Sequence, residues 1–275
     1  MLTEVSYSLA LLTGLSGILA GALGGMLGLG GGVFLVPVLV QGLGVPMPQA
    51  VAVSLTTVIA TSNVLSASPS ARAVINLRLG FLLELLTVAG GLLGSITALL
   101  VTQRTLMITF SVVMATMSAL TFLRRDHRNN LPAAIDPGRW GGRFEDDAGQ
   151  LVTYQVKRLP LALATSFVAG NLSTLLGIGG GVVKVPVLNA WCGIPMRVAA
   201  VTSAFMIGVT ATSGALVYLG RGLLLPTLAA AAVIGVRIGS TLGLRFGGRW
   251  PARRLKILLA VVLALVSILM ISRLP

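Results

Sequence analysis

Few ionisable side chains lie within the long apolar stretches of this chain, and each could contribute chemistry. Lys184 follows a run of glycines, Arg237 lies in the apolar stretch 223–246, and Glu84 lies in the apolar stretch 79–101. Ionisable groups inside a bilayer are costly and are usually functional. Lys184 could hold an anion, Arg237 could contact two oxygens of an oxyanion with its guanidinium, and Glu84 could carry a coupling proton.

Each of these side chains also has a structural interpretation, which the sequence leaves open. Lys184 could extend to the membrane interface or pair with Glu84. Arg237 could bind the carbonyls at a helix C-terminus. Glu84 lies six residues after Arg78, and we favour a surface ion pair near the cytoplasmic edge for it.

A glycine-rich motif occurs twice, as GLGGGV at 28–33 and as GIGGGV at 177–182. A dinucleotide-binding fingerprint needs a further glycine, where this chain has Val33 or Val182, and it needs a strand before the motif. A nucleotide site is therefore not favoured.

The glycine runs are instead expected to interrupt helices. Three consecutive glycines destabilise a helix by about 1 kcal/mol each relative to alanine, and proline is best tolerated in the first turn of a helix. We therefore expect unwound backbone at 28–35 and 177–184, with short helices that begin near Pro37 and Pro186.

Unwound backbone at membrane depth must line a cavity or be buried in protein, and the amides at a helix start favour anions. The glycines expected to contact an anion are Gly30, Gly31, Gly32, Gly179, Gly180 and Gly181. Polar side chains expected to line the same pathway are Asn171 and the repeated pairs Ser54/Ser203 and Thr61/Thr210.

The composition indicates a membrane protein rather than a soluble enzyme. Apolar residues make up 55% of the 275 residues, charged residues 10%, and the mean hydropathy is +0.96, whereas soluble domains carry about 25% charge. The net charge of +13 lies mostly in connections between apolar stretches, so it marks topology rather than nucleic-acid binding. One cysteine, Cys192, and one histidine, His127, exclude a disulfide framework, a zinc site and a His-containing triad, so we expect neither an enzyme nor a cofactor.

Ten apolar segments are candidates for membrane helices. Two of them, 33–44 and 182–194, have only about a dozen residues, so neither spans the bilayer core as a straight helix, and each could be an interfacial or re-entrant piece. The segments are 5–27, 33–44, 48–66, 79–101, 104–123, 159–178, 182–194, 197–218, 223–246 and 254–272.

The two halves of the chain repeat at an offset of 149 residues, from the glycine motifs through Val36-Pro37-Val38-Leu39 and Val185-Pro186-Val187-Leu188. With a short gap, Gly90, Gly94 and Ser95 align with Gly235, Gly239 and Ser240. The sequence therefore predicts an all-α polytopic fold with two inverted copies, 1–123 and 159–275, joined by a solvated cytoplasmic linker at 124–158.

The basic residues set the expected orientation, because cytoplasmic loops are rich in Lys and Arg. With 124–158 in the cytoplasm, the cluster from Arg245 to Lys256 is also cytoplasmic only if 182–194 counts as a crossing. We favour that count, which places both termini outside.

The doubled Gly-[Leu/Ile]-Gly-Gly-Gly-Val-x-x-Val-Pro-Val-Leu motif, followed by Gly-x-Pro-Met, resembles the TauE/SafE sulfite-exporter family, also called the toluene-sulfonate uptake permeases. The resemblance implies a secondary transporter of the bacterial inner membrane that moves sulfite or organosulfonates, with export as the favoured direction and a small anion and lipid as partners. A passive anion channel and a membrane scaffold are the alternatives. Lys184 aligns with Leu35, which suggests that the two copies contribute unequally.

Overall fold

The computed structural model describes residues 7–27, 30–68, 74–123, 131, 135–145, 150–247 and 252–272. The first half contains α1 (Tyr7–Leu27), α2 (Gly32–Pro37), a π-helical turn η1 (Val38–Gly42), α3 (Met47–Ala67), α5 (Leu77–Leu100) and α6 (Gln103–Leu123). Two strands follow, β1 (Gly142–Glu145) and β2 (Leu151–Tyr154). The second half contains α7 (Leu159–Leu176), α8 (Gly181–Cys192), α9 (Met196–Gly220), α10 (Pro226–Gly247) and α11 (Ala252–Ser272).

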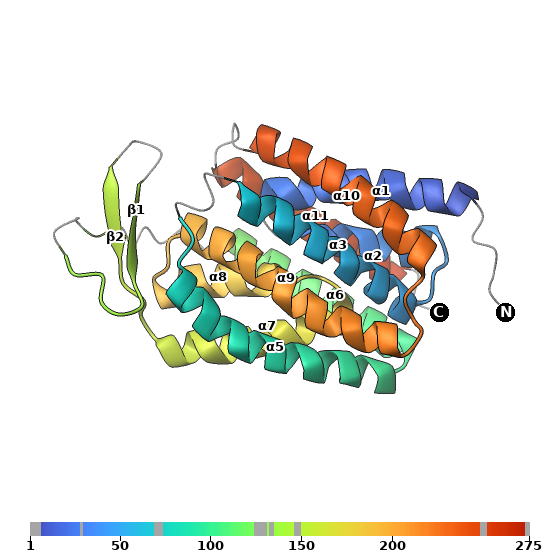
Figure 1. The fold of residues 1–275 in the computed structure, drawn as a ribbon, viewed down its shortest axis with the longest axis horizontal. Helices are drawn as coiled ribbons and strands as arrows, with labels where there is room; N and C mark the ends of the chain where they lie inside the picture. The colour runs from blue at the N-terminus through green and yellow to red at the C-terminus, as the bar shows by residue number, and fades with distance from the viewer. Residues whose placement is uncertain are drawn as a thin grey trace.

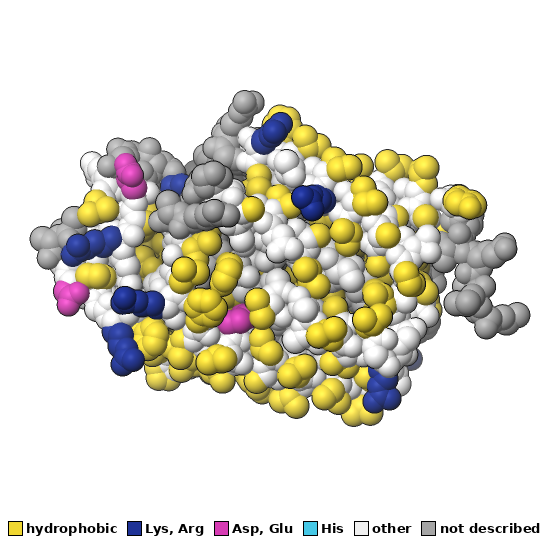
Figure 2. All heavy atoms as spheres, in the orientation of Figure 1, with side chains coloured by type: hydrophobic (Ala, Val, Ile, Leu, Met, Phe, Trp, Pro, Cys, Tyr) yellow, Lys and Arg dark blue, Asp and Glu magenta, His cyan; other side chains and the backbone are white. Residues whose placement is uncertain are grey.

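The helices form one elongated bundle, and β1 and β2 project beyond one end of it (Figure 1). Seven helices among the described residues are long and apolar enough to cross a membrane, namely α1, α3, α5, α6, α7, α9 and α10. Hydrophobic side chains cover much of the bundle in Figure 2, and several Lys and Arg side chains lie toward the hairpin end. The prediction of an all-α multi-pass membrane protein is confirmed.

The elements of the two halves repeat at one constant offset of 149 residues. The helix starts Gly32, Met47, Leu77 and Gln103 recur as Gly181, Met196, Pro226 and Ala252. The halves therefore share one order and spacing of helices from the glycine motif onward.

This constant offset corrects the gapped alignment of Gly90 with Gly235. Gly90 packs against the backbone of Phe167, and Gly239 packs against the backbone of Ile18. Ile18 and Phe167 are themselves equivalent at the offset of 149 residues. Gly90 is therefore the equivalent of Gly239. Glycines recur every four residues on one face of these helices, so an alignment of the sequence alone can be wrong by four residues.

Equivalent helices of the two halves run in opposite directions where they pack together. In the α3–α9 pair, the Ser62 hydroxyl donates to the Ala204 carbonyl at 2.6 Å, while Leu55 lies beside Gly214. In the α6–α11 pair, the Ser118 hydroxyl donates to the Ala260 carbonyl at 2.7 Å. The first half thus meets the second through antiparallel pairs of corresponding helices.

The first helix of each half packs in parallel against the third long helix of the other half, as α1 with α10 and α5 with α7. Glycines mediate both contacts: Gly21 faces the backbone of Val236, and Gly170 faces the backbone of Thr87. Small residues allow helices to approach closely in lipid. The halves are therefore interleaved rather than set side by side as separate units.

The short helices turn back toward the end from which the preceding helix came. The amide of Lys157, just before α7, donates to the carbonyl of Cys192 at the end of α8 at 2.8 Å. The return of α8 means that α7 and α8 together leave and re-enter one end of the bundle. α7 and α8 therefore add two passages, and Arg245 lies at the same end of the bundle as the hairpin. This is the arrangement that follows when 182–194 is counted as a crossing.

The segment 124–158 contains a folded hairpin, which the sequence did not predict. Its strands pair antiparallel, with Gly142 opposite Tyr154 and Glu145 opposite Leu151. Phe144, Val152 and Tyr154 are buried. The interpretation of the whole segment as solvated is wrong for these residues, because the many charges around them obscured a short apolar pattern.

The hairpin is docked on the helical bundle by apolar packing and by hydrogen bonds from Asn76. The buried hairpin side chains share a hydrophobic cluster with residues of α8, including Val185 and Leu188. The Asn76 Nδ2 group donates to the Tyr154 hydroxyl at 2.8 Å and to the Trp140 carbonyl at 2.9 Å. Burial raises the pKa of Tyr154, so the phenol is held in its neutral form.

Candidate functional site

Both glycine motifs interrupt helices, as the sequence predicted. In the second half, α7 ends at Leu176, and Gly177, Gly179 and Gly180 have φ angles of 71°, 78° and 56° before α8 begins. In the first half, Gly30 has a φ angle of 78° before α2 begins, whereas Gly28 and Leu29 lie outside the described residues. Side chains with a Cβ disfavour this left-handed region, and glycine adopts it readily.

The short helices begin earlier than expected, at Gly32 and Gly181 rather than near the prolines. Pro37 ends α2, where a π-helical turn takes over, and Pro186 lies inside α8. The expectation of unwound backbone to residues 35 and 184 is therefore wrong. The helices can begin this early because only the glycines with positive φ must lie outside them. Pro186 is tolerated in the second turn of α8 because a proline there removes a single backbone hydrogen bond.

The two glycine motifs touch each other across the halves. A Cβ on Gly32 would collide with the Gly177 carbonyl oxygen and would lie 2.6 Å from the Ser54 hydroxyl. That hydroxyl donates to the Gly177 carbonyl at 2.6 Å. By contrast, a Cβ on Gly31 would have its nearest neighbours at 3.4 Å, which is ordinary contact. Close approach therefore requires glycine at position 32 but not at position 31.

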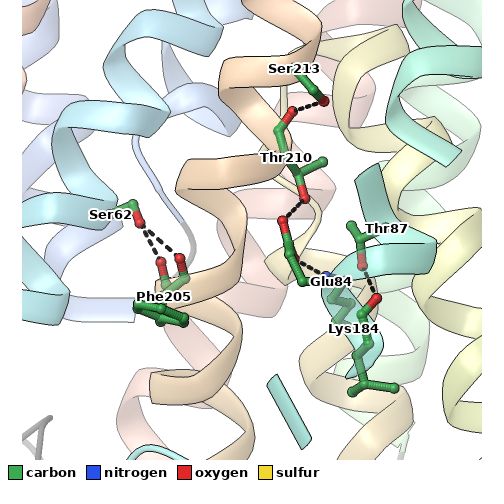
Figure 3. Close-up of polar contacts among 9 residues, drawn as sticks. Ser62, Glu84, Thr87, Lys184, Phe205, Thr210 and Ser213 are labelled. Carbon is green, nitrogen blue, oxygen red and sulfur yellow. Dashed lines mark hydrogen bonds and ion pairs between the residues drawn. The ribbon is translucent and has the colours of Figure 1, made fainter. Parts of the chain in front are cut away.

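A buried ion pair joins Lys184 of α8 and Glu84 of α5. The Lys184 Nζ atom is 3.7 Å from the Glu84 Oε2 atom, and the side chains are 0% and 9% exposed. Thr210 of α9 donates to Glu84 Oε1 at 2.7 Å. Figure 3 shows Glu84 between Lys184 and Thr210, with each side chain provided by a different helix. The surface ion pair favoured for Glu84 is wrong, whereas the pairing of Lys184 with Glu84 is confirmed.

The pair leaves hydrogen-bonding capacity unused. Neither Lys184 Nζ nor Glu84 Oε2 has a hydrogen-bond partner in the structure. A lysine ammonium has three N–H donors, and a buried charge needs both a counter-charge and hydrogen bonds to offset its desolvation. An anion with several oxygens could accept hydrogen bonds from these donors. Such an anion would compete with the Glu84 carboxylate for Lys184.

The hydroxyl pairs expected to act alike differ between the halves. Thr61 donates to the Thr57 carbonyl of its own helix at 2.8 Å, whereas its equivalent Thr210 holds Glu84. Ser54 bonds Gly177, whereas its equivalent Ser203 is buried with no hydrogen-bond partner. In each of these two pairs, the residue of the second half is the one that contacts the ion pair or keeps a free donor.

Arg237 does not join this cluster. It is exposed on α10, and no contact brings its guanidinium to Lys184 or Glu84 in the part of the chain that the structure describes. Asn171 is partly exposed on α7, and its carbonyl faces Gly94. The sequence therefore placed too many polar residues in one site.

Ser166 and Ser173 of α7 were not predicted as site residues, yet both are buried and their hydroxyls have no hydrogen-bond partner. They are seven residues apart and so lie on one face of the helix. A polar residue repeated at this spacing next to the glycine motif was a signal that could have been used. Among the described residues, no three His, Cys, Asp or Glu side chains gather at a potential metal site.

Comparison with known proteins gives a family for this chain. It is 27% identical to the "Probable membrane transporter protein YunE" of Bacillus subtilis (strain 168) over 260 residues, which cover 91% of the chain and 93% of that relative. It is 36% identical over 103 residues to "Sulfite exporter TauE/SafE family protein 6" of Arabidopsis thaliana, over 38% of the chain and 24% of that relative. No solved structure matches. The model of the family "Sulfite exporter TauE/SafE" matches residues 13–270, and the chain therefore belongs to this family of membrane transporters.

Proposed function

We propose that this chain is a secondary transporter that moves sulfite or an organosulfonate across the inner membrane by alternating access, with export as its physiological direction. The observation that carries the proposal is the Lys184 ammonium, which is fully buried, is paired with Glu84 and has no hydrogen-bond partner. A buried lysine with unused donors suits a small oxyanion. The family description supports sulfite as one substrate and export as the direction.

The arrangement of the halves supports alternating access. Because α3 and α9 run antiparallel, as do α6 and α11, we propose that the halves are inverted repeats around a central site. Inverted repeats can exchange conformations and so open the site to either side. The carrier model thus rests on antiparallel pairs of equivalent helices.

The basic residues support one orientation. Arg78, Arg139, Lys157 and Arg245 lie at the hairpin end, whereas Arg104, in the first turn of α6, and Arg221, just after α9, lie at the opposite end. Since cytoplasmic loops are enriched in Lys and Arg, we propose that 124–158 is cytoplasmic and that the chain enters and leaves the membrane from outside.

The ion pair suggests how an anion and a proton are coupled. A bound oxyanion and the Glu84 carboxylate compete for the one ammonium of Lys184. Protonation of Glu84 removes that competition, so a proton on Glu84 favours an anion on Lys184, and the two ions cross in the same direction. Net flux then follows the sum of the anion and proton gradients, so export occurs when the outward gradient of the anion exceeds any inward gradient of protons.

Flux of radiolabelled sulfite from proteoliposomes tests this function, with the membrane potential clamped by valinomycin and potassium. We expect saturable efflux that is faster when the vesicle interior is more acidic than the bath. Efflux that rises linearly with sulfite and ignores the pH gradient would identify a passive channel. Protein-free rates in intact, correctly folded protein would identify a scaffold.

A further inference from the structure

The buried hydroxyls without partners are distributed unevenly between the halves. Among the described helices, the first half has one buried hydroxyl without a hydrogen-bond partner, that of Ser66, whereas the second half has Lys184 Nζ and the hydroxyls of Ser166, Ser173 and Ser203. All four lie on α7, α8 and α9 of the second half. An unpaired buried donor costs about 1–3 kcal/mol, so four of them within three adjoining helices call for a ligand.

The equivalent positions in the first half carry no free donor. The residues that precede Ser166, Ser173 and Lys184 by 149 are Gly17, Gly24 and Leu35. Ser54, the equivalent of Ser203, is bonded to Gly177.

Packing fills the corresponding space in the first half. A Cβ on Gly24 would lie 2.7 Å from the backbone of Gly30, and a Cβ on Gly17 would lie 2.8 Å from the Ala232 carbonyl. The first helix there lies directly against its neighbours, with no room for a side chain. The second half has hydroxyls at these two positions, so the halves differ in packing as well as in composition.

The donors of α7 and α8 follow one path, and Ser203 lies two turns before Thr210 on the same face of α9. A Cβ on Gly180 would be 3.5 Å from the Ser173 hydroxyl, and the Lys184 amide donates to the Gly180 carbonyl at 3.0 Å, so Lys184 is one helical turn beyond the residue that Ser173 faces. Ser166 lies two turns back along α7, on the same face as Ser173. Because α8 runs antiparallel to α7, α8 continues from Gly180 past Lys184 in the direction of Ser166.

We propose that the transported sulfur oxyanion is held by the second half alone, with Lys184 as its counter-charge and with Ser166, Ser173 and Ser203 as hydroxyl donors. This inference rests on the proposed function. Sulfite and sulfonates present three oxygens around sulfur, and an ammonium with several short hydroxyl donors matches them. The first half then acts as packing support, and its glycines and Leu35 do not contact the anion.

Serine-to-alanine variants at Ser166 and Ser173 test the proposal, with Ser95→Ala as the matched control. Ser95 is also fully buried, but its hydroxyl donates to carbonyls of its own helix at 2.9 and 3.1 Å. Sulfite binding to the purified protein and the melting temperature without ligand are measured for each variant. We expect Ser166→Ala and Ser173→Ala each to weaken sulfite binding about tenfold, with no fall in melting temperature because an unpaired hydroxyl has been removed. We expect Ser95→Ala to bind as the wild type does.

The outcomes separate this inference from the proposed function. Wild-type affinity in both Ser166→Ala and Ser173→Ala, with lost affinity in the double variant Lys184→Ala/Glu84→Gln, would overturn the serine assignment and leave the transporter proposal standing. An equal loss of affinity in Ser95→Ala would also overturn the assignment. Absence of sulfite and methanesulfonate binding to folded wild-type protein would overturn the proposed function itself.

Discussion

The Ser54 hydroxyl of α3 donates to the Gly177 carbonyl at a distance of 2.6 Å, and so ties the first half of the chain to the glycine motif of the second. Gly32, the first residue of α2, lies against the same two groups. The two helix breaks therefore pack against one another, and we expect a substitution at either break to disturb the structure of both halves.

Gly32→Ala is expected to abolish sulfite transport and to lower the melting temperature, because the new Cβ collides with the Gly177 carbonyl. Gly31→Ala is expected to be tolerated, since its Cβ would have ordinary contacts at 3.4 Å. Gly220→Ala, with no atom within 4 Å of its Cβ, is the control. Wild-type flux in Gly32→Ala would refute the close approach of the two motifs.

Ser54→Ala and Ser203→Ala form a matched pair at equivalent positions of the two halves. Ser54→Ala leaves the buried Gly177 carbonyl without its hydroxyl donor, so we expect a loss of about 1–3 kcal/mol in the free energy of unfolding. Ser203→Ala removes a hydroxyl with no partner, and we expect no loss. Thermal melts in detergent measure both variants, and equal destabilisation would contradict the asymmetry between the halves.

Single cysteines in a Cys192→Ser background test the orientation. Arg139→Cys lies at the hairpin end and Arg221→Cys in the loop at the opposite end, and both positions are exposed. In intact cells a membrane-impermeant maleimide should label position 221 and spare position 139, and a reporter fused to the C-terminus should be periplasmic. Labelling of both positions from one side would rule out the topology.

Tyr154→Phe tests how the hairpin is docked. The variant loses the hydrogen bond from Asn76, for which we expect about 1 kcal/mol of lost stability. Burial raises the pKa of Tyr154 above its ordinary value of 10, so the unfolded chain loses this proton at a lower pH than the folded one. Stability should therefore fall as the pH rises past 10 in the wild type. Melting curves across this range should show a weaker fall in Tyr154→Phe, and an identical fall would show that Tyr154 does not contribute to it.

The helical architecture could be predicted from the sequence because its signals are local. Long apolar stretches gave the membrane helices, and the offset between Gly32 and Gly181 gave the duplication. The glycine runs predicted the helix breaks, but not the helix starts, because a glycine can begin a helix when neighbouring backbone leaves no room for a side chain. Gly32 against Gly177 is such a case.

The site was only partly predictable because it depends on which helices meet. Lys184 was recognisable as an asymmetric charge, but the burial of Glu84 depends on how α5 packs against α9, which no local pattern contains. Arg237 has the same apolar surroundings in the sequence as Lys184, yet it lies exposed on α10. The docked hairpin was missed because Phe144 and Tyr154 are separated by charged residues and find their partners on α8.

A test of the proposed role of Lys184 requires a variant that removes its charge without leaving Glu84 buried and unpaired. Lys184→Ala alone leaves Glu84 buried without a counter-ion, which typically costs about 3–5 kcal/mol. The double variant Lys184→Ala/Glu84→Gln removes both charges and is expected to fold. Glu84→Gln alone is its control, because it keeps the ammonium and removes the competing carboxylate.

Equilibrium binding of radiolabelled sulfite to these purified, folded variants tests the central claim most directly. The account predicts that Glu84→Gln binds sulfite at least as tightly as the wild type and that Lys184→Ala/Glu84→Gln loses measurable binding. Wild-type affinity in the double variant would contradict it.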